Sequence, residues 1–178
     1  HADGYVRYRA LVLLTGFNDP RTADVMYDAV KSPNDRLRAA AFSYFEHHPD
    51  PDMMASLLGA LDTEQGEFVR PALVRTLAAL GSSPLVQAAL IREVGRGEDY
   101  FRSAVIEALG DYKATYAFSA LQGITNQQGP LLDDAALALG KLGDKRAIPV
   151  LAALQGTAPR EIGRAHVLTP VTFRNLVC

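Results

Sequence analysis

The sequence predicts an all-α fold, a right-handed α-solenoid of about five antiparallel helix pairs. Two observations predict it. A hydrophobic–Arg step followed by an Ala/Leu-rich segment recurs along the chain, and no stretch alternates apolar and polar residues with period two. The arginines of the step, Arg7, Arg38, Arg70 and Arg102, are 31, 32 and 32 residues apart. Self-similarity at such a period is typical of stacked repeats, because one helix pair cannot bury its apolar face alone.

The first helix of a repeat is clearest in residues 101–110. Apolar residues stand at 101, 104, 105, 108 and 109, the spacing of an amphipathic helix. Gly110 follows, and we expect it to end the helix because glycine readily adopts the left-handed conformation. Equivalent segments predict first helices over 5–15, 34–46, 67–80, 99–109 and 130–140.

The second helices begin after short turns that combine a capping side chain with proline or glycine. These turns are Asn18-Asp19-Pro20, Pro49-Asp50-Pro51, Ser82-Ser83-Pro84 and Gly143-Asp144. The apolar spacing that follows them predicts second helices over 20–31, 51–62, 84–94, 113–126 and 144–155.

Residues 133–151 carry a family resemblance. They run Asp-Asp-Ala-Ala-Leu-Ala-Leu-Gly-Lys-Leu-Gly-Asp-Lys-Arg-Ala-Ile-Pro-Val-Leu and resemble a HEAT repeat of the bacterial type named after phycobilisome lyases. The resemblance extends over roughly residues 5–156 and implies an armadillo-like stack of helix pairs. It is specific for the fold and weak for function, because such repeats serve scaffolds, adaptors, lyases and nucleic-acid enzymes alike.

The repeated arginine has a structural interpretation. An acidic residue stands two positions before the apolar residue of the step in three repeats. In HEAT-like stacks such acids and arginines commonly bridge adjacent repeats, and the planar guanidinium suits paired hydrogen bonds. We expect an inter-repeat ladder, with ligand binding by the arginines as the alternative. Its predicted members are Arg7, Arg38, Arg70, Arg102, Asp35, Glu67 and Asp99.

Three tyrosines are candidate contacts for a protein partner: Tyr27, Tyr112 and Tyr116. They lie on or next to second helices, which the resemblance implies line the concave side of the solenoid. Exposed tyrosines there would suit protein recognition. The alternative is that they pack between repeats.

The tail of the chain does not continue the pattern. Residues 162–172 resemble a translated sequencing-library adapter, with Leu168 where that frame has a stop codon, and residues 175–178 match its continuation. The alternative is a sixth repeat, which Pro170 would interrupt. We therefore expect a solenoid over 1–161, an adapter-derived tail over 162–178 and, because the chain opens at His1, a bacterial fragment from environmental DNA that lacks both ends.

Composition narrows the classes of partner. The net charge is −2, and without the tail 16 basic residues face 20 acidic ones. An acidic segment without tryptophan makes nucleic-acid binding unfavourable. No long apolar run predicts membrane insertion. The only cysteine, Cys178, lies in the tail. The compartment is open, with the cytoplasm favoured over the periplasm.

Motifs for chemistry are weak. The densest polar cluster, residues 46–52, includes His47 and His48, but adjacent helical residues point about 100° apart and do not converge on a metal ion. No His-Glu dipeptide of the iron-binding HEAT-like hydroxylases occurs. Residues 95–97 lack the context and lysine of a phosphate loop. We expect no catalytic residue, no metal and no cofactor.

The sequence therefore predicts a non-catalytic protein–protein interaction scaffold or adaptor module whose partner is a protein of unknown identity. Two alternatives stay open. One is an enzyme-associated subunit such as a bilin lyase-like protein, as the name of the repeat suggests. The other is a nucleic-acid-binding HEAT-like protein.

Overall fold

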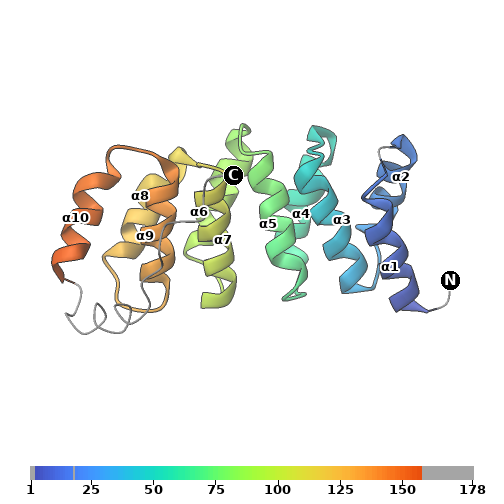
Figure 1. Ribbon diagram of the computed structural model, residues 1–178, viewed down its shortest axis with the longest axis horizontal. Helices are drawn as coiled ribbons and strands as arrows, with labels where there is room; N and C mark the ends of the chain where they lie inside the picture. The colour runs from blue at the N-terminus through green and yellow to red at the C-terminus, as the bar shows by residue number, and fades with distance from the viewer. Residues whose placement is uncertain (1–2, 18, 158–178) are drawn as a thin grey trace, which may run out of the picture. The chain divides into compact units, whose positions relative to one another are not determined.

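Helices make up the architecture. The computed structural model describes residues 3–17 and 19–157, and this part contains ten α-helices, two short 3-10 helices and no strand (Figure 1). The prediction of an all-α solenoid is confirmed. The first helices of the pairs are α1 (Gly4–Leu14), α3 (Asp35–His47), α5 (Val69–Ala79), α7 (Asp99–Asp111) and α9 (Leu131–Leu142). The second helices are α2 (Pro20–Ala29), α4 (Met54–Thr63), α6 (Pro84–Val94), α8 (Phe118–Thr125) and α10 (Ala147–Thr157).

The chain divides into two compact units, residues 1–144 with α1 to α9 and residues 145–178 with α10. The predicted boundary between residues 161 and 162 lies outside the described residues. So do both interpretations of the tail, as an adapter-derived segment or as a sixth repeat.

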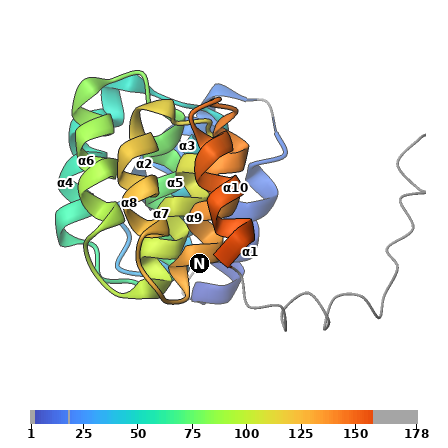
Figure 2. The ribbon, with the colours of Figure 1, turned by 90° about the vertical axis from the view of Figure 1, so that its left-hand side faces the viewer.

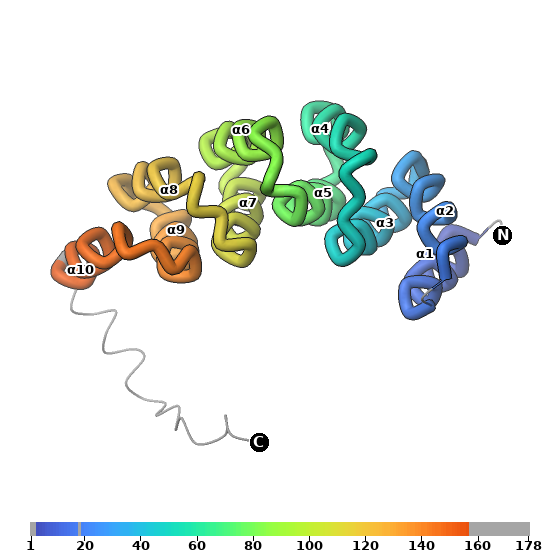
Figure 3. The backbone as a smooth tube through the Cα atoms, turned by 90° about the horizontal axis from the view of Figure 1, so that it is seen from above, coloured from blue at the N-terminus to red at the C-terminus, as the bar shows by residue number. Residues whose placement is uncertain are grey.

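Within the first unit the helices form two layers. Seen end-on, α4, α6 and α8 lie in one layer and α3, α5, α7 and α9 in the other (Figure 2). Consecutive first helices pack against each other along the whole row from α1 to α9. Seen from above, this unit is an arc with the first helices on its inner side (Figure 3). The prediction that second helices line the concave side is therefore wrong for this unit. We call the first helices α1, α3, α5, α7 and α9 the inner row.

The repeated apolar residue anchors each pair in the core. Leu37, Val69, Phe101 and Leu131 occupy this position in α3, α5, α7 and α9, and each is buried, with at most 6% of its surface exposed. Val6 occupies the same position in α1 and is 43% exposed. The burial of apolar side chains at one register in successive repeats makes the core continuous along the stack.

Side chains cap the helices at two of the four predicted turns and also at the start of α3. Asp19 accepts a hydrogen bond from the Arg21 amide at the start of α2, and Asn34 accepts two at the start of α3. Asp50 caps the 3-10 helix Pro51–Met53 that leads into α4. Ser83 stands at the N-cap of α6 without a capping hydrogen bond from its side chain, so there Pro84 at the first helical position is the start signal.

Two helices continue past their predicted ends at residues 109 and 140. Gly110 lies inside α7, where a Cβ atom would approach the Ala138 Cα to 2.8 Å. Its role is the close packing of α7 on α9, and Lys113 takes the left-handed conformation instead, with φ 51°. Likewise α9 runs past Gly140 to Leu142, and Gly143, with φ 69°, ends it. At Gly110 the physical reason is the tertiary contact with α9, whereas a Cβ atom at Gly140 would meet nothing within 4 Å.

Candidate functional site

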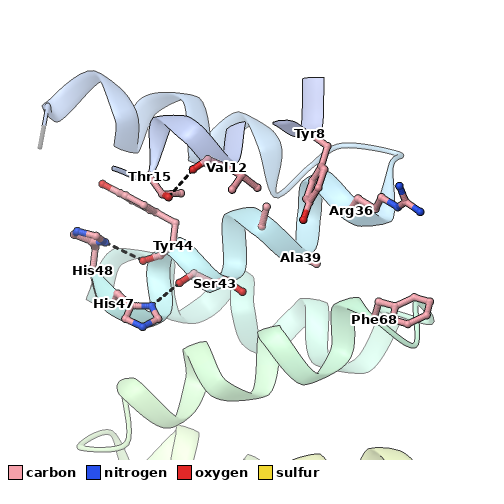
Figure 4. A pocket seen from close by; sticks show the side chains of 11 residues that line it. Tyr8, Val12, Thr15, Arg36, Ala39, Ser43, Tyr44, His47, His48 and Phe68 are labelled. Carbon is pink, nitrogen blue, oxygen red and sulfur yellow. Dashed lines mark hydrogen bonds between the residues drawn. The ribbon is translucent and has the colours of Figure 1, made fainter. Parts of the chain in front are cut away.

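A groove runs along the inner row between α1 and α3 and ends beside Phe68, just before α5 (Figure 4). Its volume is about 760 Å³. On α3 the buried residues lie on one side of the helix and the groove residues on the opposite side, since successive residues turn by about 100°. The groove therefore faces away from the core. It is lined by Tyr8, Val12, Thr15, Arg36, Ala39, Ala40, Ser43, Tyr44, His47, His48 and Phe68.

Shape and charge distinguish this groove. Small residues of α3 (Ala39, Ala40 and Ser43) form one wall, and the aromatic rings of Tyr8, Tyr44 and Phe68 stand around it. Arg36 lies near Phe68 at one end, and His47 and His48 lie at the other end (Figure 4). No carboxylate occurs among the described residues that line it.

The two histidines are held by their own helix. The Nδ1 atom of His47 lies 2.9 Å from the Ser43 carbonyl oxygen, and that of His48 lies 3.0 Å from the Tyr44 carbonyl oxygen. The His48 ring also stacks on Tyr44, with ring centroids 4.2 Å apart. Within residues 3–17 and 19–157, no three metal-ligating side chains gather in one place. The geometry makes the His pair a rigid aromatic end of the groove.

The inner row repeats an exposed position two residues before each repeated arginine. Tyr5, Phe68 and Tyr100 occupy it in α1, at the start of α5 and in α7, with exposures of 59%, 76% and 62%. Arg36 holds the same position in α3 and is also exposed. Exposed aromatic residues at the equivalent position of three of the first four repeats form a line of apolar contacts available to a partner. This line was not predicted, although the register of the repeated arginines in the sequence could have revealed it.

A ladder of alternating charges crosses four helices of the inner row. Glu46 of α3 accepts from Arg75 Nε of α5 at 2.8 Å, and Arg75 Nη1 donates to Asp111 of α7 at 2.9 Å. Lys141 of α9 completes the series with a bond of 2.6 Å to Asp111. Hydrogen bonds from Lys141 and Arg75 lower the pKa of Asp111. This inter-repeat ladder has other members than the predicted one. They were not predicted, because the bonded residues are 29 to 36 positions apart in the sequence.

Arg38 is the most strongly bound of the four repeated arginines. Its guanidinium donates to both carboxylate oxygens of Glu64, at 2.7 and 2.9 Å, and also to Asp35 and the Ser32 carbonyl. Glu64 follows α4, so this contact links the first helix of its pair to the segment that leads into the next repeat. The hydrogen bond from Arg38 lowers the pKa of Glu64.

The other three arginines differ from one another. Arg70 lies over the Phe101 ring, with the guanidinium carbon 3.5 Å from the ring centroid, and its buried Nε has no hydrogen-bond partner in the described structure. Arg102 donates to the Val94 carbonyl at 3.0 Å. Arg7 is exposed and makes no ion pair with any described residue.

The predicted acids pair within their own helices or stay free. Asp35 and Asp99 bind Arg38 and Arg102, each three residues further along the same helix. Glu67 is exposed and makes no ion pair inside the described ranges. These acids therefore do not join neighbouring repeats, in contrast to the predicted ladder. The acids that do so are Glu46, Glu64 and Asp111.

The three predicted tyrosines lie between repeats. Tyr27 of α2 donates to Asp50 and packs on Phe45, with ring centroids 5.0 Å apart. Tyr112, which follows α7, donates to Glu46 at 2.9 Å. Burial, followed by the hydrogen bond to Glu46, raises the pKa of Tyr112 to about 12.

Tyr116 differs from Tyr112 in having no partner for its hydroxyl. The Tyr116 Oη is buried and makes no hydrogen bond in the described structure, and it lies 3.3 Å from the place where a Cβ of Gly81 would stand. Burial raises the pKa of Tyr116 to about 12. All three tyrosines are half-buried and hold repeats together, which corresponds to the packing alternative for them.

Arg92 of α6 and Arg96, which follows α6, are bound to carboxylates. Arg92 and Arg96 both contact Asp62 of α4, at 2.8 and 3.2 Å, and both contact Glu93, whose side chain is 1% exposed. This cluster joins α4 to α6. It leaves little free positive charge for phosphate in this region. No described helix is long and apolar enough to cross a membrane.

Comparison with known families agrees with the repeat architecture. Residues 1–78 match HEAT repeats, and residues 132–157 match the PBS lyase HEAT-like repeat. The chain is a HEAT repeat protein. No curated protein matches the chain.

Proposed function

We propose that this HEAT repeat protein is a non-catalytic protein–protein interaction scaffold or adaptor module that binds its partner along the inner row. The observation that carries the proposal is the line of exposed aromatic residues, Tyr5, Phe68 and Tyr100, at one position of the first, third and fourth repeats. Large aromatic side chains contribute strongly to protein interfaces because they bury much area with few rotatable bonds.

The stacked helices support this proposal energetically. The inter-repeat ladder from Glu46 to Lys141 ties four first helices to one another. A surface that is already ordered loses little conformational freedom on binding, so more of the contact energy becomes affinity. The ladder thus favours a pre-formed surface over a segment that folds on binding.

Photo-crosslinking from defined positions tests the proposal. A benzophenone side chain replaces the exposed Tyr100 of α7 on the inner row, outside the groove, or the exposed Ser119 of α8, and each protein is irradiated in a cell extract. We expect peptide adducts from position 100 in clear excess over position 119. Equal yields from the two positions, or nucleotide adducts from position 100, would contradict the proposal.

A second candidate is an enzyme-associated subunit such as a bilin lyase-like protein. The match of residues 132–157 to the PBS lyase HEAT-like repeat favours it. Its test is a titration of the protein with a free bilin. A shifted visible absorbance band that saturates at a fixed stoichiometry supports the tetrapyrrole function, and an unshifted spectrum rejects it.

A further inference from the structure

We infer that the groove between α1 and α3 binds a peptide segment that carries apolar side chains and at least one carboxylate, which pairs with Arg36. This inference rests on the proposed function and adds the chemistry of the partner. It concerns the groove of about 760 Å³ lined by α1, α3 and Phe68.

The walls of the groove suit apolar side chains of a partner. Ala39, Ala40 and Ser43 are small, so a partner backbone can approach α3 closely. Tyr8 and Phe68 offer ring surface on either side, and Phe68 is 76% exposed. Arg36 and His47 are eleven residues apart on α3, which places them about 16 Å from each other along the helix axis. That length accommodates several apolar side chains of one continuous segment.

The carboxylate follows from the charge of the groove. Arg36 is exposed, lines the groove and makes no ion pair or side-chain hydrogen bond with any residue of the described ranges. Two residues further on, Arg38 is saturated by Glu64, Asp35 and the Ser32 carbonyl. The free cation at the groove is therefore Arg36, and its natural acceptor is a carboxylate of the partner.

Arg36 restricts the recognition of a carboxylate to the groove between α1 and α3. The equivalent residues of the neighbouring repeats are aromatic, Tyr5 before it and Phe68 and Tyr100 after it. Arg36 also lies in the first turn of α3, where the helix dipole adds positive potential. Asp35, next to it, is engaged by Arg38 and lies outside the groove lining. A peptide carboxylate thus meets one cation at a defined end of an apolar channel.

A displayed library of random dodecapeptides is the probe. The library is selected on the immobilised full chain, and peptides that enrich are synthesised and titrated by fluorescence anisotropy. Arg36→Glu reverses the charge at the groove, and Ser43→Trp fills it without changing a buried residue. Arg9→Glu is the matched control, because Arg9 is exposed on α1 and does not line the groove. Circular dichroism verifies that each variant keeps the helical fold.

The expected result is a set of peptides that combine apolar residues with Asp or Glu. Their affinity falls about tenfold or more in Arg36→Glu, as loss of a charge-assisted contact predicts, falls in Ser43→Trp, and is unchanged in Arg9→Glu. Peptides without acidic enrichment, or with equal affinity for Arg36→Glu, overturn the inference and leave the scaffold function standing. A selection that enriches nothing over an empty surface also overturns it, while the crosslinking contrast between positions 100 and 119, both outside the groove, decides the scaffold function separately.

Discussion

Arg75 and Glu46 join two neighbouring first helices through a 2.8 Å bond between Arg75 Nε and Glu46 Oε1. The same Glu46 oxygen accepts the hydroxyl of Tyr112, which lies two repeats away from it along the inner row. One carboxylate thus receives donors from two different repeats. Because the Glu46 side chain is only 9% exposed, its charge depends on these donors for compensation.

Replacement of Arg75 by leucine tests the ladder. The variant leaves Glu46 and Asp111 without their shared cation, and we expect the free energy of unfolding to fall by about 2 kcal/mol, discounted for the partial exposure of the pair. Urea denaturation measures it. The control is Arg21→Ala, whose ion pair with Asp19 is on the surface and should leave the midpoint unchanged. Equal stability of the Arg75 variant and the wild type would mean that the ladder contributes nothing.

Two tyrosine-to-phenylalanine variants should behave differently. Tyr112→Phe removes a hydrogen bond to Glu46 and should destabilise the protein by about 1 kcal/mol. Tyr116→Phe removes a buried hydroxyl that has no partner, so it should be neutral or stabilising by up to about 1 kcal/mol. Thermal or urea unfolding of the two variants in parallel makes the comparison. A larger loss in Tyr116→Phe than in Tyr112→Phe would refute the assignment of their environments.

Alkaline pH should destabilise the fold through the same two side chains. The pKa values of Tyr112 and Tyr116 are raised from 10.0 to about 12, so the folded protein disfavours the phenolate. Their contribution to stability is complete below pH 10 and is lost as the pH rises towards 12. We expect the urea midpoint of the wild type to fall more steeply over this interval than that of a Tyr112→Phe/Tyr116→Phe double variant. If the urea midpoints of the two proteins fell in parallel with pH, the raised pKa values of Tyr112 and Tyr116 would be contradicted.

Two glycine-to-alanine substitutions should have opposite signs. At Gly110 the added Cβ would lie 2.8 Å from the Ala138 Cα and force α7 and α9 apart, with an expected cost of about 1–3 kcal/mol. At Gly59, exposed within α4, a Cβ meets nothing within 4 Å, and alanine should stabilise by about 0.5–1 kcal/mol. Differential scanning calorimetry of both variants distinguishes them. A stabilised Gly110→Ala protein would show that the two helices are less closely packed than described.

The repeat pattern predicted the helices because the apolar residues that form the core recur at helical spacing. Apolar residues such as Val69 and Phe101 occupy the same buried position of their helix pairs. The burial of that position follows locally from the helical spacing of apolar residues. The ends of helices were less predictable. Gly110 follows the last apolar residue of its stripe, but its lack of a side chain serves the contact with Ala138 and not a turn.

The binding surface was harder to predict than the fold. Tyr27, Tyr112 and Tyr116 have the residue type of interface anchors, yet the neighbouring repeats half-bury them. Exposure depends on which helix row faces inward, and that depends on the accumulated angle between pairs. The partners of Arg75 were equally hard to predict from the sequence, because Glu46 and Asp111 become its neighbours only when α3, α5 and α7 stack.

The most direct test of the central claim is the affinity of the inner row for a partner recovered by crosslinking from position 100. The measurement compares the wild type with a Phe68→Ala/Tyr100→Ala double variant and with Leu85→Ala, an equally exposed change on α6 of the outer layer. The account predicts that the double variant weakens binding by about tenfold or more, since removal of interface aromatic residues commonly costs above 1 kcal/mol each, while Leu85→Ala leaves it unchanged. Equal affinity of the double variant and the wild type would contradict the claim that the inner row is the binding surface.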